Sequence, residues 1–166
     1  MENWNAQKAN AKSKLFSQII LTGLVAGTLD IVAACTQFYV KTGNSPMRVL
    51  EYVASGALGP DAFTGGIGMA LAGLFFHYFI AMNWTVLLFM LYPIFALLRK
   101  NKYATGVGYG IFVWAMMNLI VVPLSRIPAR PLSLGPAIQA AIILIVCIGI
   151  PISLMANRFF SPKGSN

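Results

Sequence analysis

Two ionisable side chains interrupt long apolar stretches of this sequence. Asp30 lies in the first stretch, and His77, the single histidine of the chain, lies in the second. A charged Asp at the centre of a spanning helix costs at least about 2.5 to 3.5 kcal/mol, so such a group needs a partner or a purpose. A carboxylate and an imidazole can exchange a proton or bind a small polar solute. These two residues are therefore the first candidates for chemistry.

Small residues predict that both groups point at protein. Residues three, four or seven positions apart share one side of a helix, and such stripes of small residues mark close approach between membrane helices. The stripes consist of Gly23 and Gly27 with Asp30, and of Gly66 and Gly73 with His77.

Helix geometry predicts that the two ionisable groups lie at the same depth. With a rise of about 1.5 Å per residue, both lie roughly 15 to 18 Å below the outer helix ends. Asn118 and Gln139 are shallower, at roughly 6 to 8 Å. We therefore expect an outward-opening polar funnel with Asp30 and His77 at its floor, Asn118 and Gln139 on its wall, and Asp61, Arg126 and Arg130 at its mouth.

Three interpretations of these residues stay open. The funnel could bind or pass a small solute or a proton. Alternatively, Asp30 and His77 could form a buried hydrogen bond that only fixes helix register, as in a structural or accessory subunit. A third interpretation is a membrane enzyme that acts on lipid or quinone with this pair as general acid and base. That enzyme would need a nucleophile or cofactor to which no residue points.

Signatures of common enzymes are missing from the sequence. No G-x-S-x-G, H-E-x-x-H, Walker or paired-Cys motif occurs. One His and four acidic residues are too few for a conventional metal centre. We therefore expect no catalytic residue, no metal and no cofactor.

The run Thr105 to Gly110 resembles a potassium-channel filter, but it follows a basic loop, whereas a filter follows a pore helix near the outer side. Its glycines, Gly106 and Gly110, are expected to let the third span pack tightly and to offer a contact face to a second copy in a homo-oligomer.

Composition places these residues in a lipid bilayer. The chain has 166 residues, of which 58% are hydrophobic and 10% are charged, far from the average of soluble proteins. The apolar runs predict an all-α, four-transmembrane-helix bundle in a single membrane domain, residues 1 to 166. The expected spans are about 15–40, 65–98, 104–124 and 136–157, with a short outer interfacial helix at about 46–55.

The net charge of +8 does not indicate nucleic-acid binding, because the basic residues are scattered in short groups between apolar runs. Cationic residues are enriched in cytoplasmic loops of membrane proteins. The distribution therefore places both termini in the cytoplasm. One side carries Lys8, Lys12, Lys14, Arg99, Lys100, Lys102, Arg158 and Lys163, and the other carries Lys41, Arg48, Arg126 and Arg130.

Several short motifs over most of residues 20 to 125 resemble a family of uncharacterised small bacterial integral membrane proteins, and more distantly the YagU-like four-span proteins. The resemblance implies a bacterial inner-membrane location and supplies no substrate. Its motifs are Gly27-Thr28-Leu29-Asp30, Ser45-Pro46 with Val49-Leu50, Ser55-Gly56-Ala57-Leu58-Gly59-Pro60 with Ala62-Phe63 and Gly65-Gly66, His77, and Asn118 with Pro123-Leu124-Ser125.

Overall fold

The computed structural model describes residues 2–127 and 133–161, and the regular secondary structure of this part of the chain consists of helices, without strands. Four helical stretches are long and apolar enough to cross a membrane: Gln7–Thr42, Gly66–Ile94, Lys102–Leu124 and Leu134–Phe160. The expected all-α class with four spanning helices is confirmed.

The spans are built from shorter elements. The first is α1 (Glu2–Thr42), and the outer connection contains α2 (Met47–Leu58) and the 3₁₀ turn η1 (Pro60–Phe63). The second is α3 (Gly66–Ile94), followed by α4 (Ala96–Lys100). The third combines α5 (Lys102–Met116), the π-helical η2 (Met117–Val121) and α6 (Val122–Leu124). The fourth combines α7 (Leu134–Leu144), the π-helical η3 (Ile145–Gly149) and α8 (Ile150–Phe160).

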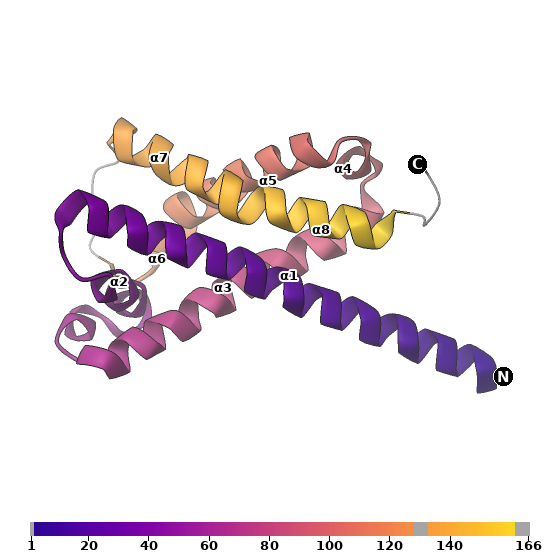
Figure 1. The fold of residues 1–166 in the computed structure, drawn as a ribbon, viewed down its shortest axis with the longest axis horizontal. Coiled ribbons are helices and arrows are strands. Elements are labelled where there is room, and N and C mark those ends of the chain that lie inside the picture. The colour runs from indigo at the N-terminus through magenta and orange to yellow at the C-terminus, as the bar shows by residue number, and fades with distance from the viewer. Residues whose placement is uncertain (1, 128–132, 162–166) are drawn as a thin grey trace.

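Different elements lie at the two ends of the bundle. Both chain termini and α4 lie at one end, and α2 lies at the other (Figure 1). Helix α1 projects beyond the bundle at its N-terminal end (Figure 1), because no glycine or proline interrupts residues 2–22. Its 41 residues span about 61 Å, roughly twice the thickness of the hydrocarbon core. The helix thus begins well before residue 15.

The second span is shorter than expected. Pro93 lies in the last turn of α3, which ends at Ile94, and Phe95 is extended. Proline removes a helical N–H and its ring crowds the preceding turn, so a helix end here follows from the residue type. The predicted range to residue 98 therefore divides into α3 and the short α4.

Helix α2 packs directly onto α3 through its backbone. A Cβ added at Gly73 would lie 1.9 Å from the carbonyl oxygen of Leu50, so only glycine permits this approach. Glu51 and Ser55 on α2 are buried, and Arg48 Nη1 lies 3.3 Å from Glu51 Oε2. The outer helix expected at about 46–55 is thus present as α2, and it is folded onto α3 of the bundle.

The third and fourth spans meet at an equally close contact. A Cβ on Gly149 would lie 2.1 Å from the carbonyl oxygen of Gly106, and a Cβ on Gly110 would lie 2.5 Å from Cα of Ile145. The glycines of the third span therefore pack inside one subunit. The expectation that Gly106 and Gly110 offer a face to a second copy is wrong, because the fourth span already covers them.

An apolar core fills the end of the bundle that carries the termini. Hydrogen bonds cross-link the spans there: Tyr109 Oη donates to the Trp84 carbonyl at 2.5 Å, and Ser153 Oγ donates to the Lys102 carbonyl at 2.7 Å. This core cluster consists of Ala26, Leu88, Phe89, Tyr92, Tyr109, Val113, Ile148, Ile152 and Ala156. By contrast, Leu71, Phe75 and Phe79 on α3 are exposed, as expected for side chains that face lipid.

Replacing Gly73 with alanine should separate α2 from α3. The new Cβ collides with backbone, which cannot turn aside as a side chain can, so we expect the unfolding free energy to fall by about 1 to 3 kcal/mol. Unfolding of the purified protein in mixed micelles measures the change. Gly68→Ala is the matched control, since no atom lies within 4 Å of its added Cβ. Equal stability of the two variants would contradict the close contact.

Candidate functional site

His77 ties the second span to the first. Its Nε2 lies 2.8 Å from the carbonyl oxygen of Gly27. A carbonyl oxygen can only accept a hydrogen bond, so Nε2 carries the proton and Nδ1 is left for other interactions. One residue further along each helix, the hydroxyls of Thr28 and Tyr78 lie 2.8 Å apart. Two adjacent hydrogen bonds thus fix the register of α1 against α3.

Gly27 makes this approach possible. A Cβ on Gly27 would lie 3.0 Å from Cδ1 of Tyr78, and a Cβ on Gly23 would lie 2.8 Å from Sδ of Met82. The predicted packing stripe on α1 therefore contacts α3. Gly66, by contrast, begins α3 with φ +59° and has no atom within 4 Å of an added Cβ, so it contributes a backbone conformation and no helix contact.

Asp30 and His77 border the same internal space, which we call the deep cavity. Its volume is about 270 Å³. Among the described residues, no hydrogen bond or ion pair joins Asp30 to His77, and the imidazole bonds to Gly27 instead. All four spans and α2 line the deep cavity, with Asp30, Ile31, Ala34, Val49, Tyr52, Val53, His77, Ile80, Ala81, Trp84, Val113, Met117, Leu144 and Ile148.

Both π-helical segments border the deep cavity. Met117 begins η2 and Ile148 belongs to η3, and both side chains line it. A π segment widens the helix locally, and such segments occur frequently at functional sites. The third and fourth spans thus depart from regular α geometry where they face Asp30 and His77.

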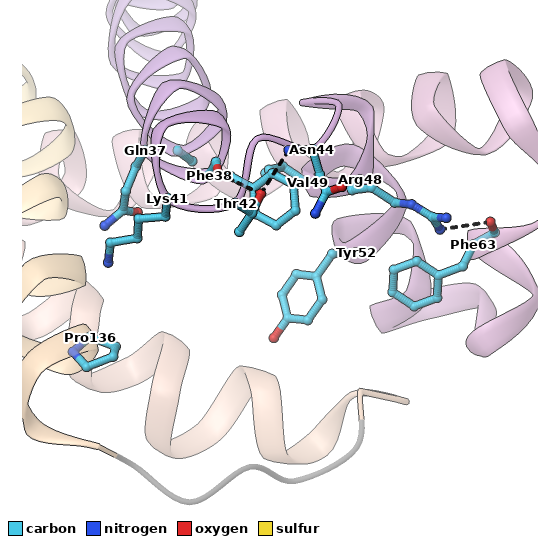
Figure 2. A pocket seen from close by; sticks show the side chains of 11 residues that line it. Gln37, Phe38, Lys41, Thr42, Asn44, Arg48, Val49, Tyr52, Phe63 and Pro136 are labelled. Carbon is cyan, nitrogen blue, oxygen red and sulfur yellow. Dashed lines mark hydrogen bonds between the residues drawn. The ribbon is translucent and has the colours of Figure 1, made fainter.

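A second, wider hollow lies above the deep cavity, and we call it the outer mouth. Its volume is about 660 Å³, and Ala34, Val49 and Tyr52 line both spaces. Figure 2 shows Tyr52 in the middle of the outer mouth, with Lys41 and Arg48 on opposite sides of it. The complete lining is Ala34, Gln37, Phe38, Lys41, Thr42, Asn44, Arg48, Val49, Tyr52, Phe63 and Pro136.

The two residues expected on the funnel wall lie elsewhere. Asn118 Nδ2 donates to the Trp114 carbonyl one turn earlier at 2.8 Å, which is an ordinary bond within a helix. Gln139 Oε1 accepts a hydrogen bond from Lys41 Nζ, so it supports the rim of the outer mouth. Neither side chain lines the deep cavity.

The three residues expected at the mouth do not line it either, as far as the structure describes them. Asp61 lies in η1, where its carbonyl accepts bonds from the backbone and hydroxyl of Thr64. The backbone N–H of Arg126 donates to the Gly56 carbonyl at 3.0 Å. Arg130 lies outside the described residues.

Four residues that border the two spaces were not predicted from the sequence as site residues: Lys41, Arg48, Tyr52 and Trp84. Trp84 follows His77 by seven positions and therefore lies on the same side of α3, a signal that the sequence does contain. Its indole Nε1 is buried, and the described part of the chain offers it no hydrogen-bond partner. Tyr52 could not be placed in this way, because α2 reaches the site only through its contact with α3.

Within the described part of the chain, no group of three or more His, Cys, Asp or Glu residues is arranged to hold a metal ion. Comparison with protein-family models, curated proteins and solved structures finds no match to this chain. The chemistry of the site therefore has to be argued from its own residues.

The tautomer of His77 is a direct test of this geometry. Because the Gly27 carbonyl accepts from Nε2, the neutral ring should carry its proton on Nε2 and leave Nδ1 unprotonated. The chain has one histidine, so ¹⁵N-histidine labelling followed by solid-state NMR yields one imidazole spectrum without assignment. His77→Gln, which removes that spectrum, is the control. A neutral ring protonated on Nδ1 would contradict the bond to Gly27.

Proposed function

We propose that this chain is an integral inner-membrane protein of bacteria that binds a small solute or a proton between Asp30 and His77, reached from the outer mouth. The observation that carries the proposal is that these two ionisable residues face one cavity, which shares three lining residues with a wider hollow at the α2 end of the bundle.

The energetics of packing support a binding role. Protein interiors are close-packed, and voids larger than a water molecule are few. Here four spans and α2 leave about 270 Å³ unfilled around Asp30 and His77. Keeping an ionisable group in a spanning helix is costly, and a ligand or water in the cavity would satisfy it. Polar groups around an otherwise apolar space are typical of small-molecule sites.

We infer binding rather than catalysis from the residues around the cavity. Among the described residues its lining includes no Ser, Thr, Cys or Lys. Activation of a nucleophile requires a base in hydrogen-bond contact with it, whereas the described hydrogen bond of His77 goes to the backbone carbonyl of Gly27, and none joins Asp30 to a second side chain. Asp30 and His77 can therefore exchange protons, and neither is paired as an activated nucleophile. The enzyme alternative acting on lipid or quinone therefore has less support than solute or proton binding.

The rival function is that of a structural or accessory subunit, and one observation favours it. The bond from His77 Nε2 to the Gly27 carbonyl, at 2.8 Å, holds α1 against α3 without any ligand. A polar bond between membrane helices adds about 0.6 to 2 kcal/mol. Asp30, however, is not needed for this bond, so the structural role leaves its charge unexplained.

The charge distribution and the resemblance to small bacterial membrane proteins support the proposed location. The bundle end that carries both termini also carries Lys8, Lys12, Lys14, Arg99, Lys100, Lys102 and Arg158. Because cytoplasmic segments are rich in Lys and Arg, both termini belong in the cytoplasm. The outer mouth then opens to the opposite, periplasmic side.

This orientation can be tested with reporter fusions. A fluorescent protein that folds only in the cytoplasm should be bright at either terminus, and alkaline phosphatase should be inactive there. A phosphatase inserted after Gly43, between α1 and α2, should be active. The reverse pattern would place the outer mouth on the cytoplasmic side and contradict the proposed location.

Replacing Asp30 with asparagine tests the binding role. The amide keeps the shape of the side chain and removes its charge, so we expect any small molecule retained by the parent protein to be lost. Native mass spectrometry of the detergent-purified proteins measures retention, and it also reports whether further copies assemble. Asp61→Asn is the matched control, because Asp61 lines neither space.

The same comparison distinguishes solute or proton binding from the structural role. Solute binding is contradicted if the parent, Asp30→Asn and Asp61→Asn are all found ligand-free with identical assembly. If Asp30→Asn also leaves proton uptake into proteoliposomes unchanged, proton binding is contradicted as well and the structural role stands.

A further inference from the structure

We propose that the solute is a small carboxylic acid with an apolar body, attracted as an anion at the outer mouth and bound in the deep cavity in its protonated, neutral form. This inference rests on the proposed function and specifies its ligand. Three features carry it: the charge of the outer mouth, the apolar walls of the deep cavity, and the hydrogen-bonding groups left without partners there.

The outer mouth carries only positive charge among its described lining residues. Lys41 and Arg48 line it, and no Asp or Glu does. Glu51 pairs with Arg48 Nη1 at 3.3 Å, but its side chain is 3% exposed whereas that of Arg48 is 54% exposed. The surface that a solute meets first is therefore positive. Such a field concentrates anions at an entrance and repels cations.

The deep cavity cannot hold the same solute as an anion. Most of its walls are Ile, Val, Leu, Ala and Met side chains, and its only acidic residue is Asp30. An unpaired anion loses far more solvation energy there than it gains, so a group that can take up a proton becomes neutral instead. A permanent anion such as a sulfonate stays charged and is excluded. A carboxylate instead takes up a proton from the bulk solution when it leaves the mouth, and it enters the deep cavity as the neutral acid.

The polar groups of the deep cavity match a neutral carboxyl group. The Trp84 side chain lines the deep cavity, and its Nε1 is buried with no hydrogen-bond partner among the described residues, although buried polar groups are nearly always paired. Since Nε2 of His77 donates to Gly27, Nδ1 of the neutral ring can accept, as can the Asp30 carboxylate. A protonated carboxyl group offers one C=O acceptor for the indole and one O–H donor for the imidazole or carboxylate.

Tyr52 connects the two spaces through which the acid would pass. Its side chain lines both of them, and Figure 2 shows the ring between Lys41 and Arg48 with its hydroxyl directed into the outer mouth. No hydrogen bond of this hydroxyl occurs among the described residues. It can therefore hydrogen-bond a carboxylate at the mouth, while the ring lies against an apolar body below.

Four probes with one six-carbon body isolate the head group: hexanoic acid, hexanamide, hexylamine and hexanesulfonate. Equilibrium binding to the full-length protein in nanodiscs, with empty nanodiscs subtracted, measures each affinity. Because the bound form is neutral, we expect hexanoic acid and hexanamide to bind, and hexylamine and hexanesulfonate to bind at least about tenfold more weakly. The affinity of hexanoic acid should rise as the pH falls from about 8 to 6, because its binding takes up a proton, whereas hexanamide takes up none. The amide lacks a charge for the mouth, so it should associate more slowly than the acid.

Three variants locate the binding groups. Trp84→Phe should weaken hexanoic acid binding about tenfold by removing the donor to its carbonyl. Trp114→Phe is the matched control, since its Nε1 is also buried without a partner but lines neither space. Lys41→Gln, at the exposed rim, should slow the association of hexanoic acid, and not that of hexanamide, without disturbing the core. It keeps the test valid if Trp84→Phe does not fold.

Each remaining outcome overturns the inference. Binding of hexylamine or hexanesulfonate as tight as that of hexanoic acid, or an acid affinity that does not change with pH, would show a cavity that binds solutes of another class, so the proposed function would stand and the acid would not. An affinity unchanged by Trp84→Phe together with an association rate unchanged by Lys41→Gln would place hexanoic acid at a different surface. No binding by any probe would exclude the acid, and solute retention by the parent protein would still decide the proposed function.

Discussion

Backbones in this bundle approach each other where glycine leaves no side chain between them, and the site depends on two such contacts. At Gly73 the backbone of α2 rests on α3, with the Leu50 carbonyl where a Cβ would stand. At Gly149 the fourth span rests on the third in the same way, against Gly106. The first contact brings α2 over the gap between the spans, and the second holds the opposite wall. Between them lies the deep cavity. Because lipid offers no hydrophobic drive for helices to associate, close packing of this kind has to supply the attraction.

The two ring nitrogens of His77 have different roles, one in helix packing and the other in the site. Nε2 joins α1 through the Gly27 carbonyl, which fixes how deep the ring sits and which nitrogen is left over. The ring also borders the deep cavity with Asp30. A residue held in this way is preorganised, so a solute does not have to order it on binding. Register and binding are therefore not exclusive explanations of the histidine, whereas Asp30 has no structural bond of this kind among the described residues.

Local patterns in the sequence predicted much of this fold and part of its site. Runs of apolar residues identified four spans, and helical spacing with about 1.5 Å of rise per residue placed Asp30 and His77 on facing sides at one depth. The residues of the outer mouth were not predicted as part of the site, because their positions depend on contacts between residues that are far apart in the sequence. Lys41 bonds to Gln139 across nearly a hundred positions. Tyr52 reaches the cavity only because the backbone of α2 rests on α3 at Gly73. A periodicity within one helix carries no information about which neighbour covers it.

The core cluster closes one side of the deep cavity, opposite the outer mouth. Val113 and Ile148 belong both to the deep-cavity lining and to this cluster, so the cavity floor continues directly into the packed aromatic rings of Phe89 and Tyr92. The connection to the outer mouth is made by Ala34, Val49 and Tyr52, which line both spaces. If the proposed solute binds here, it would exchange in this conformation with the compartment at the outer mouth. Net transfer to the side of the termini would then require the core cluster to open.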